Sequence, residues 1–445
     1  MSRRVVVDLT MSKTDEIIRK QAEYGISMLP EGREPAVFVE GKGIIVKDLE
    51  GKEYLDCFGG YSAVNLGHCH PKVVKAIQDQ AAKLWHVSWD YYTLPQTELA
   101  EKLAQICPKG LKKSLFSSAG AEAIEFAVKL AKKYSSSKGR LGTHIISLMG
   151  SFHGRTSMAV ALTGQNRLKM GLGNYVAPGA VHAPAPYCYR CFFGLNYPEC
   201  DLRCAKSIAD VIKYQTQGEV AAFISEPVMG EGGIIVPPDD YLKEVLKIIK
   251  DYQALYIADE IQSGFGRTGK LFAFEWYGVN PDILVMAKGI ASGIPIAATI
   301  ATEEVSNAFT AADHSSTYGG NAVMCAAALA NIEAMLEEKI PEKALKTGNF
   351  ILHRLEDLAR RHKLIGEVRG KGLMIGIELV KDQKSKEPAV EESSKVREEM
   401  RKRGILIGKG GVSRSVLRIQ PPLIITEEQA QKVVDTLDAS LRSIA

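Results

Sequence analysis

Apolar residues recur along the chain with two spacings, and each spacing predicts one kind of element. Near the N-terminus a helix is predicted over Thr14–Tyr24, and alternating apolar and polar residues around glycines at 36–56 predict two short strands. Apolar residues three and four positions apart then predict helices at 73–86, 97–107 and 121–135. Short β-branched runs predict strands at 112–118, 143–151, 220–227, 255–260 and 282–289.

The strands and helices alternate, which predicts an α/β fold built of βα units around a mostly parallel sheet. After about residue 325 helices dominate, and two further apolar runs predict strands at 372–380 and 416–425. This change predicts a smaller α+β domain near the C-terminus. The polar stretch 381–395 is predicted to be a solvated loop.

Polar or small residues follow several of the predicted strands directly. In parallel sheets ligands bind outside the carboxyl ends of the strands, so these residues are the candidates for a functional site. They are Ser118–Gly120, Ser151–His153, Glu226, Asp259–Glu260 and Lys288.

Asp259 and Lys288 end two consecutive apolar strands and stand 29 residues apart. Lys288 lies between Ala287 and Gly289, and an amine with so little bulk around it can lose its proton and attack a carbonyl. A carboxylate that faces the ring nitrogen of pyridoxal 5′-phosphate (PLP) keeps the ring protonated and electron-withdrawing. From the spacing alone, a partly buried ion pair between the two side chains is an equally good interpretation.

The overall composition narrows the classes of function. The chain has 445 residues, 46% hydrophobic and 24% charged, and its formal charge of +4 is spread along the sequence, so nucleic acid is not an expected partner. No run reaches the roughly 18 apolar residues of a membrane span. The N-terminal stretch has no secretory apolar segment and carries early acidic residues, so we expect a cytoplasmic protein.

Four of the eight cysteines lie close together with the spacing C-x2-C-x8-C-x3-C, namely Cys188, Cys191, Cys200 and Cys204. This spacing could hold zinc or an iron–sulfur centre, or form one or two disulfides. The irregular surroundings, rich in proline, glycine and aromatic residues, favour reduced thiols without a metal. No metal ligand is therefore assigned to the functional site.

Blocks of sequence spread over nearly the whole chain resemble the class III (ω-type) aminotransferases, which have PLP fold type I. The longest is IADEIQSGFGRTGKLFAFEWYGVNPDILVMAKGIASGIP (257–295), and others in family order stand at 117–132, 150–164, 224–238, 316–330, 368–379 and 416–425. The resemblance implies a large PLP-binding domain at 61–325 and a small domain formed by 1–60 and 326–445. It also implies a homodimer, or a dimer of dimers, with shared active sites.

Carried onto this chain, the resemblance assigns most of a cofactor site. Lys288 resembles the Schiff-base lysine, which also moves the proton between Cα and C4′. Asp259 resembles the partner of the pyridine nitrogen, and Gln262 the donor to the ring hydroxyl. Phe152 resembles the aromatic residue that stacks on the ring. The remaining cofactor-side residues are Gly120 and Ala121 at a helix start, His153, Glu226 and the phosphate ligand Thr317, which reaches across from the second subunit.

Other residues resemble those that select the substrate. Arg155 resembles an arginine that binds a carboxylate far from the reacting amine, and Arg418 one that binds the 2-oxo acid carboxylate. Glu231 resembles a gate that pairs with the latter arginine when an ω-amino substrate is bound. Tyr61 resembles the corresponding residue of ornithine aminotransferases, and Trp89 belongs to an aromatic cluster at the expected substrate entrance. Structural salt bridges for the arginines and core packing for Trp89 are the alternatives.

The resemblance therefore predicts PLP-dependent transfer of an amino group from an ω-amino acid or amine to pyruvate or 2-oxoglutarate, in two half-reactions. An amino-acid racemase or epimerase on the same fold is the second hypothesis, because returning a proton to Cα needs no acceptor. A catalytically silent relative is the third, and the presence of Lys288, Asp259 and both arginines argues against it. The blocks point to 4-aminobutyrate, ornithine and alanine–glyoxylate type relatives at once, so the donor stays open.

Overall fold

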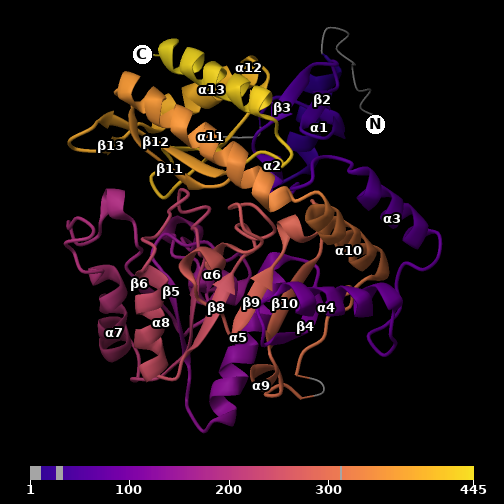
Figure 1. Ribbon diagram of the computed structural model, residues 1–445, viewed down its shortest axis with the longest axis vertical. Coiled ribbons are helices and arrows are strands. Elements are labelled where there is room, and N and C mark those ends of the chain that lie inside the picture. Colours follow the sequence, from indigo (N-terminus) through magenta and orange to yellow (C-terminus); the bar gives the residue numbers. More distant parts are fainter. Residues whose placement is uncertain (1–11, 27–33, 311–312, 445) are drawn as a thin grey trace, which may run out of the picture.

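The computed structural model describes residues 12–26, 34–310 and 313–444. At its centre is a seven-stranded sheet in the order β4-β10-β9-β8-β7-β5-β6 (Figure 1). Neighbouring strands from β6 to β9 pair in parallel, and β10 runs antiparallel to β9 and to β4. The predicted α/β fold with a mostly parallel sheet is thus confirmed. The strands are β4 (Leu111–Ser117), β5 (His144–Leu148), β6 (Ala180–Ala183), β7 (Val220–Ser225), β8 (Leu255–Asp259), β9 (Ile283–Met286) and β10 (Ala297–Thr302).

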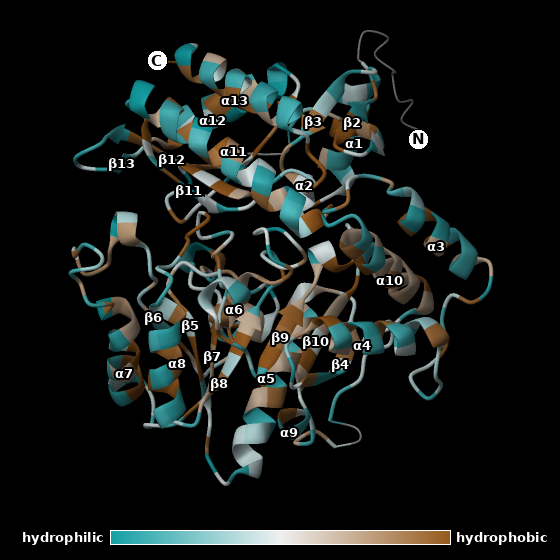
Figure 2. Ribbon diagram, viewed as in Figure 1, coloured by the Kyte–Doolittle hydropathy of each residue, from teal (hydrophilic) through white to brown (hydrophobic). Residues whose placement is uncertain are grey.

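Successive residues of the central strands face opposite sides of the sheet, and helices cover both sides. On one side Ile145 and Ile257 pack with α5 and α6, and on the other Ile146 and Phe223 pack with α7, α8 and α10. Because both faces are buried, the strands are almost wholly apolar, as Figure 2 shows for β9 and β10. The helices are α5 (Gly120–Ser137), α6 (Ser157–Leu162), α7 (Arg203–Gln215), α8 (Tyr241–Asp251) and α10 (Ala322–Glu337).

The C-terminal part of the chain forms a second, smaller sheet above the central one. Its order is β11-β12-β16-β15, with β13 paired to β12, and these pairs are antiparallel. Helices α11 and α12 pack on this sheet, and α13 packs on both helices. The elements are β11 (Ile365–Lys371), β12 (Met374–Asp382), β13 (Glu387–Pro388), β15 (Gly408–Gly410), β16 (Val416–Ile419), α11 (Ile340–Arg361), α12 (Val390–Lys402) and α13 (Glu427–Arg442).

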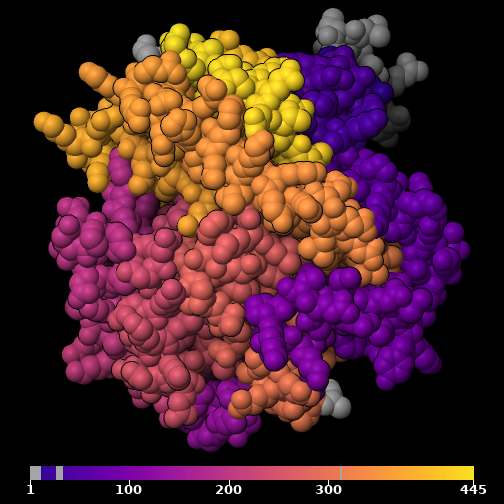
Figure 3. All heavy atoms as spheres, in the orientation of Figure 1, coloured from indigo at the N-terminus to yellow at the C-terminus, as the bar shows by residue number. Residues whose placement is uncertain are grey.

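The N-terminal segment joins the C-terminal part through a third sheet, β1-β2-β3-β14, in which Ile405 of β14 pairs in parallel with Leu55 of β3. Figure 3 shows the N-terminal segment, in indigo, and the C-terminal part, in orange to yellow, packed side by side above the central region. The remaining elements are α1 (Lys13–Tyr24), β1 (Phe38–Lys42), β2 (Ile45–Asp48), β3 (Glu53–Asp56), α2 (Gly59–Ser62), α3 (Pro71–Ala81), α4 (Leu94–Ile106), α9 (Glu303–Ser306) and β14 (Ile405–Leu406).

The division of the chain into domains stays a proposal. The sequence places a boundary after residue 325, a position inside α10, which packs on α3 and α4 beside the central sheet. We propose that the chain leaves the large domain at Lys339, the left-handed residue between α10 and α11.

The predicted loop at 381–395 is wrong in its second half, which contains β13 and the first turns of α12. This helix forms because it buries Val396 and Met400 against the small sheet, although most of its residues are charged. Among the described residues, no helix combines the length and the apolar character that crossing a membrane requires.

Candidate active site

The residues predicted at the strand ends meet around one cavity of about 430 Å³, at the edge of the central sheet that faces the small sheet. Its wall contains nine of the predicted site residues, namely Gly120, Ala121, Phe152, His153, Arg155, Glu226, Asp259, Gln262 and Lys288. They converge because β5, β7, β8 and β9 are parallel neighbours, so the residues that follow them share one edge.

Asp259 is the last residue of β8 and is buried, with 2% of its surface exposed. One carboxylate oxygen lies 2.7 Å from Nδ1 of His153, and the other accepts a hydrogen bond from the Ile261 amide at 3.1 Å. Within the described ranges, no ion pair joins Asp259 to Lys288, so the simple salt bridge that the spacing allowed is not formed. His153 is its partner, and the sequence did not indicate this pair.

Lys288 follows β9 and lines the cavity, and the rest of its side chain is surrounded by protein. Its φ of 47° lies in the left-handed region, an uncommon conformation for a residue other than glycine that is often found at functional sites. Burial lowers the pKa of the Lys288 amine, while the nearby carboxylates of Glu231, Asp259 and Glu226 oppose this shift. The net direction favours the neutral, nucleophilic amine.

This lowered pKa predicts how Lys288 reacts with pH. The neutral amine is populated at lower pH than in an ordinary lysine, so labelling of Lys288 by a small amine-reactive reagent should rise with a midpoint below 10.5. Mass-spectrometric labelling of the protein without cofactor at a series of pH values measures this midpoint, with a lysine-containing peptide as reference. A midpoint equal to that of the peptide would contradict the prediction.

The cavity also contains the beginning of α5, an 18-residue helix that starts at Gly120 directly after β4. Its first amides have no partners inside the helix, and Ala119 at the N-cap offers no side-chain oxygen to them. A side chain at Gly120 would place its Cβ 2.9 Å from Ile261, so glycine keeps this helix end close to the loop after β8. The free amides and the helix dipole make this end suited to an anion such as a phosphate.

Glu226 follows β7 and organises the loop after β5. Its carboxylate accepts hydrogen bonds from the amide of Phe152 at 2.9 Å and from that of Gly230 at 2.8 Å. Burial raises the pKa of Glu226 to about 7. The Phe152 ring lines the cavity, and the exposed guanidinium of Arg155 lies 5.1 Å from its centre. Within the described part of the chain Arg155 has no carboxylate partner, so the structural salt bridge considered for it is not present.

Arg418 and Glu231 form an ion pair although they are 187 residues apart in the sequence. Arg418 lies on β16, is 1% exposed and also donates to the carbonyl of Lys409 at 3.1 Å. Burial opposes ionisation of Glu231, but the Arg418 guanidinium outweighs it and lowers the pKa of that carboxyl group. The pair therefore stays ionised, and a buried cation is neutralised by an acid on a neighbouring loop.

Phe58 and Gln420, which come from the N-terminal and C-terminal parts of the chain, complete the surroundings and were missed by the sequence reasoning. The ring of Phe58 lies 5.1 Å from the Arg418 guanidinium. The amide nitrogen of Gln420 donates to Oε1 of Gln262 at 3.1 Å, which leaves the amide nitrogen of Gln262 as a donor. Gln420 is two residues after Arg418 on the same strand run, so the alternation of a strand could have placed both on one face.

Three predicted residues lie on the surface away from the cavity wall. Tyr61 packs on Phe58 with ring centres 4.5 Å apart, and Arg418 lies 5.7 Å from its ring. Trp89 is not core, because 42% of it is exposed, and its indole donates to the carbonyl of Gly319 at 2.9 Å. Thr317, two residues before Gly319, is exposed. The cavity of one chain thus does not use Trp89 or Thr317.

The four clustered cysteines gather around a separate small cavity between η3 (Cys188–Arg190) and the start of α7. All four are free thiols, and burial raises the pKa of Cys204 to about 12. Among the residues that the structure describes, no group of three His, Cys, Asp or Glu side chains is arranged to hold a metal ion.

Comparison with known proteins places this geometry in a family. The model of the family described as aminotransferase class-III matches residues 28–441. Acetylornithine aminotransferase from Methanocaldococcus jannaschii is 40% identical, over 92% of this chain and 94% of that protein. Leucine/methionine racemase from Thermococcus litoralis is 38% identical, over 92% of this chain and 91% of that protein.

A solved structure agrees with these sequence matches. The thermostable (S)-enantioselective omega-transaminase from Thermomicrobium roseum superposes with a TM-score of 0.90 at 34% identity, covering 96% of this chain and 98% of that one. A family match over most of the chain, relatives of similar length and a shared fold agree with a buried lysine and a buried aspartate around one cavity. The chain belongs to the class III aminotransferases.

Proposed function

We propose that this protein transfers an amino group from an ω-amino acid or an amine to a 2-oxo acid, pyruvate or 2-oxoglutarate, with PLP as its cofactor. The observation that carries the proposal is that Lys288 and Asp259 line one cavity together with the start of α5. The family is one of aminotransferases, and its relatives named above include an acetylornithine aminotransferase and an omega-transaminase, which supports a donor of this class.

The residues present fit PLP. The free amides at the start of α5 suit its phosphate, and buried Asp259 suits its protonated ring nitrogen. Phe152 offers a ring to stack on, and the Gln262 amide, oriented by Gln420, offers a donor for the ring hydroxyl. Nε2 of His153 is buried without a partner, a free polar atom beside the aspartate that the cofactor would face.

Each of these residues then has a defined task. Bound PLP supplies an electrophilic aldehyde and a ring that accepts electrons. Lys288 holds the cofactor through its amine and moves the proton at the donor's Cα, a task for which its lowered pKa suits it. Asp259, held by His153, keeps a positive charge on the ring nitrogen favourable. Glu226 fixes the loop that presents Phe152.

Two arginines are proposed to bind the substrate carboxylates. Arg155 is exposed beside Phe152 and takes the carboxylate far from the reacting amine. Arg418 takes the carboxylate of the 2-oxo acid once Glu231 moves away, whereas the Glu231–Arg418 pair closes over an ω-amino donor. One site thereby accepts an amine in one half-reaction and an acid in the other.

A panel of donors against two acceptors tests the proposal. 4-Aminobutyrate, ornithine, β-alanine and 1-phenylethylamine are each combined with pyruvate and with 2-oxoglutarate, and the amino acid formed is quantified. Alanine or glutamate formation with at least one donor is expected. If no donor gives either product while the protein binds PLP, the proposed reaction is wrong.

Racemisation is the second candidate, because a leucine/methionine racemase is among the relatives. One L-amino acid is incubated with the enzyme in the absence of any 2-oxo acid, and the D-isomer is measured. Transamination predicts no D-isomer and activity only after pyruvate is added. D-isomer formation without an acceptor would replace the transaminase by a racemase.

A homodimer is proposed as the active unit. Trp85, Tyr91, Tyr92 and Tyr318 are each 66% exposed or more. Contacts of Trp89 with Gly319 and of His86 with Tyr318 join this aromatic segment to the one that carries Thr317. So many exposed aromatic side chains near one another are typical of a protein–protein interface. A second copy on this surface would bring its Thr317 to the phosphate end of the cavity. A cytoplasmic location stays a prediction from the sequence.

Replacing Thr317 tests the shared site. If the Thr317 hydroxyl binds the phosphate in the other subunit, Thr317→Val should weaken PLP binding by about 10- to 150-fold, since a hydrogen bond to a charged group contributes about 1.5–3 kcal/mol. Thr317→Ser keeps the hydroxyl and should bind PLP normally. Titration of PLP by absorbance and sedimentation measure affinity and mass. Normal affinity in the Val variant, or a monomeric protein with a complete site, would contradict the prediction.

A further inference from the structure

A second arginine of the small sheet, Arg369, lies in register with Arg418. Arg369 of β11 pairs with Gly376 of β12, and Gly376 pairs on its other side with Arg418 of β16. Directly paired residues project from the same face of a sheet, so Arg369, Gly376 and Arg418 form one row. The two arginines stand two strands apart, about 10 Å, with a glycine between them.

A tight turn of the large domain, residues 230–234, lies against this row. At one end Glu231 pairs with Arg418. At the other end Arg369 donates through Nη2 to the carbonyl of Gly233 at 2.6 Å, and through Nε to the carbonyls of Gly233 and Ile234, both at 3.0 Å. Between them, a Cβ on Gly376 would lie 2.9 Å from Cβ of Ile234, so only glycine lets the turn come this close.

The turn is strained. Ile234 is fully buried and has a φ of 55°, a left-handed conformation that β-branched residues rarely adopt. Gly233 has a φ of 119°. The amide of Ile234 bonds to the carbonyl of Gly230 at 3.2 Å, but the carbonyls of Gly233 and Ile234 point to Arg369. Two backbone hydrogen bonds between Met229 and Ile235 close the turn, and the Gly411 amide donates to the Glu231 carbonyl. Arg369 adds the side-chain contacts that hold the carbonyls of Gly233 and Ile234.

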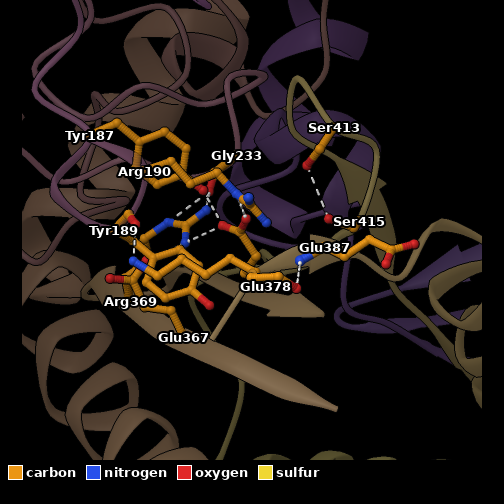
Figure 4. Close-up of polar contacts among 12 residues, drawn as sticks. Tyr187, Tyr189, Arg190, Gly233, Glu367, Arg369, Glu378, Glu387, Ser413 and Ser415 are labelled. Carbon is orange, nitrogen blue, oxygen red and sulfur yellow. Dashed lines mark hydrogen bonds and ion pairs between the residues drawn. The ribbon is translucent and has the colours of Figure 1, made fainter. Parts of the chain in front are cut away.

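Figure 4 shows the polar contacts that surround Arg369. Its Nη1 donates to Glu378 at 2.7 Å and to Glu367. Glu378 is fully buried and is also bound by Tyr187 and Arg190, which precede two of the clustered cysteines. The guanidinium lies 4.8 Å from the centre of the Tyr187 ring. A charged network of this kind fixes the direction of the Arg369 guanidinium, since each of its three nitrogens donates to an acceptor.

We propose that Arg369 is a positioning residue for substrate selection: by holding the turn at 230–234 it keeps Glu231 aligned with Arg418. The inference rests on the proposed function, in which that pair closes over an amine donor and opens for a 2-oxo acid. With the backbone of the turn held in place, only the Glu231 side chain moves when an acid enters. If the turn is loosened, Glu231 no longer pairs with Arg418. The unpaired Arg418 guanidinium then favours ligands with a carboxylate over amines.

The test is Arg369→Lys, which keeps one positive charge beside Glu378 but cannot bond both carbonyls and both carboxylates. We expect the KM of the amine donor to rise about tenfold, with the KM of the 2-oxo acid unchanged or lower. The reason is that the variant loses charge-assisted hydrogen bonds from Arg369 to the carbonyls of the turn. The two half-reactions are measured separately by single-turnover absorbance. Hydrogen–deuterium exchange of residues 229–235 should also become faster.

A second variant tests the same inference in case Arg369→Lys folds poorly. Gly376→Ala changes no charge, but its Cβ pushes Ile234 away, so it should shift the ratio of the two KM values in the same direction. Arg140→Lys is the matched control, because Arg140 also donates to two backbone carbonyls, those of Val220 at 3.5 Å and Tyr252 at 3.2 Å. It has no contact with the turn and should leave the ratio unchanged.

A double variant decides whether the effect acts through Glu231. In a Glu231→Gln background, Arg369→Lys should give little further change in the ratio. Equal changes in both KM values, unchanged exchange at 229–235, or a full effect without Glu231 would each overturn the inference. A wild-type protein that binds PLP but transfers no amino group would instead refute the proposed function, and the exchange measurement would still report whether Arg369 holds the turn.

Discussion

Lys288→Ala should abolish amino transfer, lowering kcat by about four orders of magnitude or more, because the variant loses both the nucleophile and the proton carrier of the site. The rest of the cavity is unchanged, so PLP should still bind, more weakly and without covalent attachment. Rates with the best donor and acceptor, and the absorbance of the bound cofactor, measure both effects.

Lys132→Ala is the control for this variant. Lys132 is another partly buried lysine whose pKa is lowered by burial, but it lies on α5 outside the cavity. It should retain wild-type turnover to within a few-fold. Turnover of Lys288→Ala within tenfold of the wild type would remove Lys288 from the mechanism, and with it the main support for the proposed function.

Asp259→Asn should lower kcat by about 10²–10³-fold, the range typical of losing one electrostatic contact to charge that develops during a reaction. An amide has nearly the same shape as the carboxylate but no charge to favour a protonated ring nitrogen. His153, which lies 2.7 Å from Asp259, loses an anionic partner at the same time. Single-turnover rates and the affinity for PLP are the measurements.

Asp282→Asn shows whether the effect is specific to this end of the sheet. Asp282 precedes β9 at the opposite edge, where its carboxylate accepts a hydrogen bond from the Tyr256 amide at 2.8 Å, and burial raises its pKa. This variant should change thermal stability more than kcat. A similar fall in kcat for both variants would mean that Asp259 acts through the fold alone.

Much of the central part of the site could be predicted because it follows from local pattern and topology. An apolar run predicts a buried strand, the residue after it lies at a strand end, and parallel strands place those ends on one edge. Asp259, Glu226 and Lys288 come together for this reason, and the glycine after β4 marks the start of α5. Which chemistry they perform came from the resemblance to the family.

The contacts between the central sheet region and the C-terminal sheet region could not be predicted in the same way. Gln262 and Gln420 are far apart in the sequence, as are Arg369 and the Gly233 carbonyl that it binds, and nothing in the local sequence marks any of them as a partner of the other. Their pairing depends on how the small sheet packs on the large one. The same holds for α12. Its charged sequence predicts a loop, and the helix is stabilised only because its apolar side packs on the small sheet.

The sequence by itself therefore determined the α/β architecture, the edge of the sheet that carries the site and the lysine and aspartate at its centre, because those features depend on periodicity and strand order. Only the tertiary structure decided that His153 holds Asp259 and that Arg369 and Arg418 share one row above the turn at 230–234. The physical reason is that a hydrogen bond or an ion pair depends on distances of a few ångströms, which packing sets and sequence spacing does not.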